Sequence, residues 1–197
     1  MTFDYLLALA GFSFVSSITP GPNNIMLLAS GVNFGFRRTI PHMLGISGGF
    51  AFLLACIGFG LGQLLTHAPM LYNALRIGGA IYLLYLAWKI ATSGPPEAGN
   101  EDSTPMTFLQ ASAFQWVNPK AWVMAVTSMA IYTSHLDYVT SVLTVVLVFT
   151  VVNLPCIALW CGMGVGLKAF LSEPFRLKLF NWTMAALLVM SLWPMLK

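Results

Sequence analysis

Two short polar stretches interrupt apolar runs of the sequence, and both contain residue types that can bind a charged small molecule. The first is Thr19-Pro20-Gly21-Pro22-Asn23-Asn24, and the second is Asn118-Pro119-Lys120. Proline removes a backbone donor and clashes with the preceding helical turn, so each stretch is expected to break a helix and to free backbone carbonyls and amides. Together with carboxamides and an ammonium group, such backbone groups are suited to binding a ligand's carboxylate and amine.

The elements that carry these stretches are those of a membrane protein. The chain has 197 residues, of which 58% are hydrophobic and 8% are charged, and its mean hydropathy is +0.80. These values lie outside the range of ordinary soluble domains, so we expect a lipid bilayer to be the partner of the surface. The net charge of +3 is small and scattered, which argues against a nucleic-acid partner. The N-terminus lacks the basic region of a cleavable signal, so the first apolar segment is expected to remain.

Six apolar runs are long enough to cross a bilayer, which takes about 20 helical residues. The sequence therefore predicts an all-α, polytopic membrane protein with six transmembrane helices. The predicted spans cover residues 4–32, 39–65, 70–91, 108–132, 138–167 and 178–195. The two polar stretches fall inside the first and the fourth span, so these two helices are predicted to be broken.

The basic residues predict the orientation of the spans. The first, third and fifth connections carry or adjoin Arg37, Arg38, Lys89, Lys168, Arg176 and Lys178, whereas the second and fourth contain no lysine or arginine. Basic connections stay in the cytoplasm, so the odd-numbered connections are predicted to be cytoplasmic and both termini to lie outside. Lys197 at the C-terminus opposes this orientation.

A polar linker at residues 93–107 divides the chain almost in half. It separates a first half at residues 1–92 from a second half at residues 108–197, and each half contains three predicted spans. An odd number of spans per half means that two related halves are inserted with opposite orientations. The first helix of each half contains a break, which favours two inverted three-helix halves.

The breaks have two interpretations. Freed backbone groups inside a membrane persist where protein buries them or where they line a wet cavity, which predicts a substrate site; a static proline kink is the alternative. A cation at bilayer mid-depth costs about 3 kcal/mol and is usually functional, but Lys120 lies at the cytoplasmic surface if the true span starts at Pro119. The candidate substrate-binding residues are Pro20, Gly21, Pro22, Asn23, Asn24, Asn118, Pro119, Lys120 and, with less force because it can reach the interface, Arg76.

Further motifs lie next to these stretches. They are Gly35-Phe36-Arg37, Gly45 and Gly49, Gly78-Gly79-Ala80-Ile81-Tyr82-Leu83 and Asn118-Pro119-Lys120-Ala121. With these motifs nearly the whole chain resembles the LysE/RhtB family of bacterial amino-acid exporters. The resemblance implies a multi-pass inner-membrane carrier that exports amino acids or derivatives, driven by protons or the membrane potential. The stretch Ala87-Trp88-Lys89-Ile90-Ala91-Thr92-Ser93 is most similar to exporters of cysteine and O-acetylserine.

The acidic residues bear on the charge of the substrate. All of them fall at span ends or in loops: Asp4, Glu97, Glu101, Asp102, Asp137 and Glu173. A carrier for lysine or arginine needs an intramembrane carboxylate, so we expect a neutral substrate resembling cysteine, O-acetylserine, threonine or homoserine. The same absence leaves the coupling residue open, with His42 as the titratable candidate and a plain interfacial histidine as its alternative.

Two other classes of protein share features with this chain. Gly45-Ile46-Ser47-Gly48 matches the serine motif of rhomboid-type intramembrane proteases, but the last predicted span has no histidine to act as its base, and His67 and His135 lie at outer connections. A thiol-electron carrier of the DsbD/CcdA type needs a cysteine pair near the breaks, whereas Cys56, Cys156 and Cys161 lie in the second and fifth spans. We therefore expect no enzyme activity, and no spacing predicts a metal or cofactor site.

Small residues and aromatic residues complete the predictions. The pairs Gly45/Gly49, Gly58/Gly62 and Gly162/Gly166 have the spacing that lets helices approach closely, and when exposed they also permit a homodimer. Trp116, next to Gln115, either walls a pocket at the second break or packs against lipid or core. Pro155 in the fifth span is a candidate hinge, with a static kink as the alternative.

Overall fold

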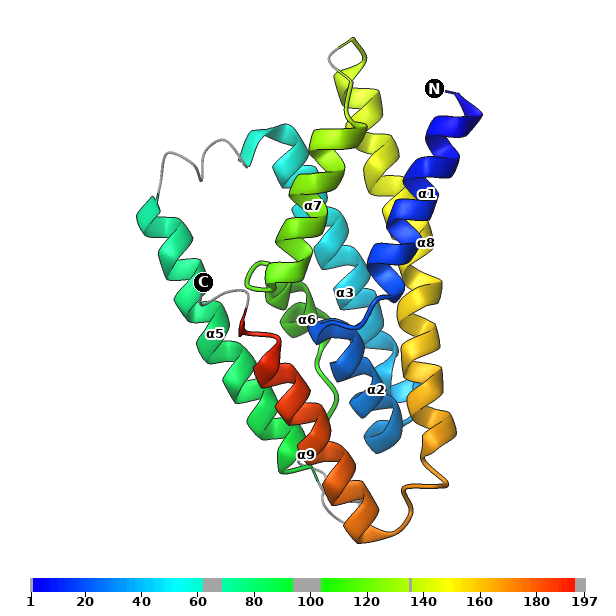
Figure 1. The fold of residues 1–197 in the computed structure, drawn as a ribbon, viewed down its shortest axis with the longest axis vertical. Helices are drawn as coiled ribbons and strands as arrows, with labels where there is room; N and C mark the ends of the chain where they lie inside the picture. The colour runs from blue at the N-terminus through cyan, green and yellow to red at the C-terminus, as the bar shows by residue number, and fades with distance from the viewer. Residues whose placement is uncertain (1, 62–68, 94–103, 135, 194–197) are drawn as a thin grey trace.

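The computed structural model describes residues 2–61, 69–93, 104–134 and 136–193, and within these ranges the chain is entirely helical (Figure 1). The helices are α1 (Phe3–Ile18), α2 (Pro22–Phe34), α3 (Phe36–Cys56) with a π-helical turn η1 (Ile57–Leu61), α5 (Pro69–Ala91), α6 (Phe108–Phe114), α7 (Pro119–Tyr132), α8 (Tyr138–Leu167) and α9 (Pro174–Met190). The predicted all-α membrane fold is confirmed, and both predicted breaks are present.

The helix bounds follow the predicted spans, with differences at the ends. α8 has the predicted bounds, whereas α3 begins at Phe36 and so includes Arg37 and Arg38, and α9 begins at Pro174 because this proline starts its first turn. By length and hydropathy, α3 with η1 and α8 can each cross a membrane; α1 and α2 meet at a 57° bend and together pass the same test, as a broken span or as a re-entrant loop. A total of six spans also requires the shorter helices to cross the membrane, and this part stays a prediction.

The helices pack around the two broken ones. α8 lies alongside both α1 and α2, α3 packs against α6 and α8, and α5 and α9 form a pair on the other flank of the bundle (Figure 1). Each broken helix is thereby clamped by a long unbroken helix: α1 and α2 by α8, and α6 by α3. This packing holds the two breaks at the same level of the bundle.

Glycines set the closest helix contacts. A Cβ on Gly31 of α2 would overlap the carbonyl oxygen of Cys161, and a Cβ on Gly164 of α8 would overlap that of Leu28, so the two backbones touch. A Cβ on Gly45 or Gly49 would likewise meet the backbone of α6, which confirms the packing role of that pair.

The prediction for the pair at the end of the fifth span was wrong. Gly162 and Gly166 have nothing within 4 Å of an added Cβ, because Gly164 lies two residues away, on the other side of the helix, and makes the contact with α2. Gly58 contacts Val142, while its predicted partner Gly62 lies outside the described residues.

Many apolar side chains face outward, and a set of polar side chains is buried inside the bundle together with the apolar core. Val123, Leu147 and Val151 are more than 60% exposed, whereas many polar side chains are buried in the bundle: Ser13, Ser17, Asn24, Ser30, Asn33, Thr39, His42, Ser47, Gln115, Asn118, Ser128, Ser141, Asn153 and Asn181. A soluble protein would not expose so much apolar surface, so lipid is the partner of the outer face.

Candidate functional site

The first break separates two half-helices at Thr19, Pro20 and Gly21. Proline at position 22 begins α2, and the preceding residue Gly21 is extended and caps α2 with no side chain. The first amides of α2, those of Asn23 and Asn24, therefore receive no side-chain cap. An uncapped helix N-terminus carries a partial positive charge and is suited to binding an anion.

The carbonyls that end α1 are bonded by side chains from three other helices. Asn24 Nδ2 donates to the carbonyls of Ser17 (2.9 Å) and Thr19 (2.8 Å), and Trp160 Nε1 of α8 donates to that of Ile18 (3.0 Å). Lys120 Nζ of α7 donates to the carbonyl of Thr19 and lies 3.5 Å from that of Pro20. The C-terminal end of α1 thus holds the lysine's positive charge, as a helix dipole favours.

The second break is bonded within itself. Residues 115–118 form turns in which each amide donates to a carbonyl three residues earlier or closer, at 3.1 to 3.4 Å. Asn118 Oδ1 accepts the Lys120 amide (3.1 Å) and so caps α7. Trp122 Nε1 donates to the Trp116 carbonyl (2.8 Å). The result is a compact platform that presents Gln115 and Lys120.

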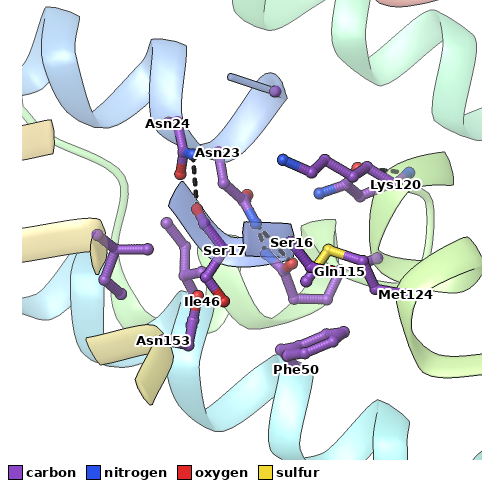
Figure 2. A pocket seen from close by; sticks show the side chains of 14 residues that line it. Ser16, Ser17, Asn23, Asn24, Ile46, Phe50, Gln115, Lys120, Met124 and Asn153 are labelled. Atoms are coloured by element: carbon purple, nitrogen blue, oxygen red, sulfur yellow. Dashed lines mark hydrogen bonds between the residues drawn. The ribbon is translucent and has the colours of Figure 1, made fainter. Parts of the chain in front are cut away.

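A pair of carboxamides joins the two breaks. Asn23 Nδ2 donates to Gln115 Oε1 (2.8 Å), and Gln115 Nε2 donates back to Asn23 Oδ1 (3.2 Å) and to the Ala111 carbonyl (2.9 Å). Gln115 is fully buried. The polar atoms of both broken helices therefore meet at one point inside the bundle, as Figure 2 shows.

A small cavity opens at this point. Its volume is about 30 Å³, and its walls come from α1, α2, α3, α6, α7 and α8 and include Ser17, Asn23, Gln115, Lys120 and Asn153 (Figure 2). Phe50, Met124 and Ile157 close its apolar side. This volume has room for a few water molecules but not for an amino acid, so the site is closed around its own polar groups.

Ser17 is a wall residue whose hydroxyl is buried without a hydrogen-bond partner among the described residues, and its side chain is 4% exposed. Buried hydroxyls are almost always bonded, so this oxygen is available to a water or to a bound ligand. No carboxylate occurs among the residues that line the cavity. The wall offers an ammonium, carboxamides, hydroxyls and backbone groups.

The structure unites most of the predicted site. Gly21, Asn23, Asn24, Asn118 and Lys120 all line the cavity, while Pro20, Pro22 and Pro119 sit at the breaks beside it. Arg76 lies in α5, but its side chain is outside the described residues. Trp116 does not line the cavity and packs against Phe52 and Trp122.

Several wall residues were not among the predicted ones. The sequence indicated Gln115 only as the neighbour of Trp116, Asn153 lies two residues before the candidate hinge Pro155, and Ser16 and Ser17 are not predicted. A signal for the two serines existed in their place within the last turn before Thr19-Pro20. α8 runs unbroken through Pro155, so the structure shows no interruption there.

The cysteines and the serine motif have no place at this site. Cys156 and Cys161 are buried, Cys56 is half-buried, and none of them lines the cavity. Ser47 is buried on α3, and the described residues contain no cluster of three His, Cys, Asp or Glu side chains that would hold a metal ion. His67 and His135 lie outside the described residues.

A lipid-facing helical bundle with two broken helices meeting around a polar cavity defines the class of α-helical membrane carriers. The LysE type translocator family matches residues 14–192 of this chain, nearly its whole length, and the chain belongs to that family. Proteins named cysteine/O-acetylserine efflux protein are 36% identical to it over 133 residues, which cover 67% of each chain; they include those of Escherichia coli strain K12 and Shigella sonnei strain Ss046. No solved structure matches this chain significantly.

Proposed function

We propose that this protein exports neutral amino acids or their derivatives, such as cysteine, O-acetylserine, threonine or homoserine, through the site at the two helix breaks. Membership of the translocator family and the names of the efflux relatives support transport of this class of substrate. The observation that carries the location of the site is Lys120, whose ammonium bridges α7 to the carbonyls of the first break.

An amino acid can replace the protein's own partners at this site. Its carboxylate takes the ammonium of Lys120 and the uncapped N-terminus of α2, since both are positive. Its ammonium takes the Thr19 carbonyl that Lys120 then releases, with Ser17 Oγ as a further acceptor. The substrate thus replaces each hydrogen bond that it breaks in the protein. No polar group is left unpaired inside the membrane, so binding does not carry that free-energy penalty.

The lack of a carboxylate in the cavity wall supports a neutral substrate. A cationic side chain of lysine or arginine would meet Lys120 with nothing to offset the repulsion, and burying an unpaired charge is strongly unfavourable. A thiol, hydroxyl or ester side chain finds apolar neighbours and carboxamides instead.

Transport requires the closed cavity to open first to one side and then to the other. In this mechanism of alternating access, the inverted halves at residues 1–92 and 108–197 move relative to each other around the breaks, in a bacterial inner membrane with both termini outside. Proton uptake or the membrane potential supplies the driving force. A homodimer through exposed small residues stays a prediction.

Efflux from preloaded proteoliposomes tests this function. The native protein is expected to release labelled cysteine and O-acetylserine, but not lysine, and to respond to an imposed pH gradient or potential. Lys120→Met should lower efflux at least ~10-fold, because it removes the charge that meets the carboxylate while keeping the length of the side chain. Lys120→Arg is the matched control that keeps the charge.

Two results would contradict the proposal. Absence of efflux for every amino acid tested, from protein that elutes as a folded particle, would overturn the transport function. Native efflux rates in folded Lys120→Met would leave amino-acid transport intact and remove the site from the breaks.

A further inference from the structure

A second and larger cavity lies beside the first. Its volume is about 400 Å³, within the range of small-molecule sites, against about 30 Å³ at the breaks. Its walls come from α2, α3, α5, α6 and the segment at residues 104–106, and it extends to the end of the bundle where α2 and α5 terminate. The proposed orientation places this end in the cytoplasm.

The two cavities follow each other along the same helices. On α3, Phe50 and Ile46 line the cavity at the breaks and His42 lines the larger one, and these residues are four apart, so they share one helix face. On α2, Asn23 lines the first cavity, and Met26, Ser30 and Asn33 continue along the helix into the second. A route from one cavity to the other can therefore be traced along α2 and α3.

His42 is a polar group in the larger cavity without a partner. Its side chain is 2% exposed, and neither ring nitrogen has a hydrogen-bond partner among the described residues. A neutral imidazole offers one donor and one acceptor, and leaving both unbonded inside a membrane protein is unfavourable. The bundle buries this side chain, so it faces the interior of the protein and not lipid.

The charge of the wall indicates the chemistry of a ligand. Lys89, which lies over the ring of Tyr85 at 5.9 Å, is the charged group of the described wall, and no carboxylate faces the cavity there. The other titratable groups that face His42 across the cavity are Tyr82 and Tyr85 of α5, while α2 and α6 contribute the neutral Ser30, Asn33 and Gln110. A small molecule with a carboxylate and hydrogen-bonding groups suits these partners.

We infer that the larger cavity is a second binding site for the amino acid, which the substrate occupies on its way from the cytoplasm to the breaks, and that His42 binds it there. This inference rests on the proposed function. In that site, Lys89 attracts the carboxylate at the mouth, and the imidazole of His42 bonds the bound molecule at the inner end.

Apolar side chains lie next to both cavities: Met26 lines the larger one, and Phe114 directly precedes Gln115 of the cavity at the breaks. Met26 is 4% exposed and packs in one cluster with the fully buried Phe114, whose ring lies 6.0 Å from that of Tyr82. Methionine is unbranched and adapts its shape readily, so this contact can rearrange when the helices shift. In this inference, the substrate moves from His42 past Met26 when the cavity at the breaks opens.

Thiol labelling tests the site directly. Ser30→Cys places a thiol in the wall at nearly unchanged side-chain size, in a chain whose native cysteines are replaced by alanine. A membrane-impermeant maleimide should label it from the cytoplasmic face, and O-acetylserine, which has no thiol of its own, should slow the labelling several-fold. Lysine should give no protection.

His42 variants separate recognition from structure. In the Ser30→Cys background, His42→Phe should leave labelling without substrate unchanged and abolish the protection by O-acetylserine. His42→Gln keeps a donor and an acceptor and should retain part of it. Val151→Cys, on the lipid-facing side of α8, and Thr140→Cys, exposed at the other end of the bundle, are controls that should stay unlabelled from the cytoplasmic face.

The outcomes distinguish this inference from the proposed function. Equal labelling with and without O-acetylserine, or full protection in His42→Phe, would overturn the second site even if the vesicles export amino acids normally. Failure of the native protein to export any amino acid would overturn the proposed function, whatever the labelling shows.

Discussion

The backbone groups freed at the two helix breaks are hydrogen-bonded in different ways. At the first break, the carbonyls of Ser17, Ile18 and Thr19 are bonded by side chains from α2, α7 and α8, whereas the second break is bonded by its own turns and by the Asn118 cap. Side-chain partners from other helices can be exchanged for a ligand, while local backbone bonds cannot. The first break is therefore the adaptable part of the site, and the second is the fixed support that holds Lys120 and Gln115.

The largest loss of stability is expected at the adaptable break. Asn24→Leu keeps the size of the side chain but removes both donors, which leaves the Ser17 carbonyl without its partner inside the bundle. The free energy of unfolding should fall by about 2 kcal/mol, the cost of a buried unsatisfied group. Denaturant unfolding in lipid micelles measures it. A change smaller than that of the Asn118 variant below would contradict the comparison.

A smaller effect is expected at the fixed break. Asn118→Ala removes the N-cap of α7 and should lower the free energy of unfolding by about 1 kcal/mol, a typical value for a lost cap. Asn118→Ser is the matched control, because its hydroxyl caps a helix nearly as well. If the serine variant were as unstable as the alanine one, the cap would not be what stabilises this break.

The sequence predicted the breaks because their cause is local. Proline and glycine act on the turn that contains them, so Pro20, Gly21 and Pro22 account for the end of α1 and the start of α2, and Pro119 accounts for the start of α7. The end of α6 at Phe114 lies outside that reach. The membrane class was predictable from composition, because composition does not depend on which residues contact one another in the fold.

The partners across the bundle were not predictable in this way. The pairing of Asn23 with Gln115 depends on how far α6 is shifted relative to α2. The hydrogen bond from Trp160 to Ile18 depends on how far α8 is shifted relative to α1. That shift is set by close contacts such as Gly31 against the backbone of α8, and the contact pattern of Gly164 rather than Gly162 shows that spacing alone does not identify the face. Trp116 likewise turned to Phe52 and Trp122 because its register, not its sequence position, decides what it meets.

The smallest effect on stability, with a distinct effect on transport, is expected at Gly21. Its backbone is extended (φ −173°), so an alanine is not strained there, but a Cβ would lie 2.6 Å from Lys120 Cδ. Because the far part of a lysine side chain is flexible, Gly21→Ala should change the free energy of unfolding by only about 0.5 kcal/mol. It should nevertheless displace the ammonium from Thr19 and raise the KM for O-acetylserine several-fold. Gly11→Ala is the control, because Gly11 has open space around it. An unchanged KM in Gly21→Ala would show that substrate binding does not require Lys120 to hold its position over the first break.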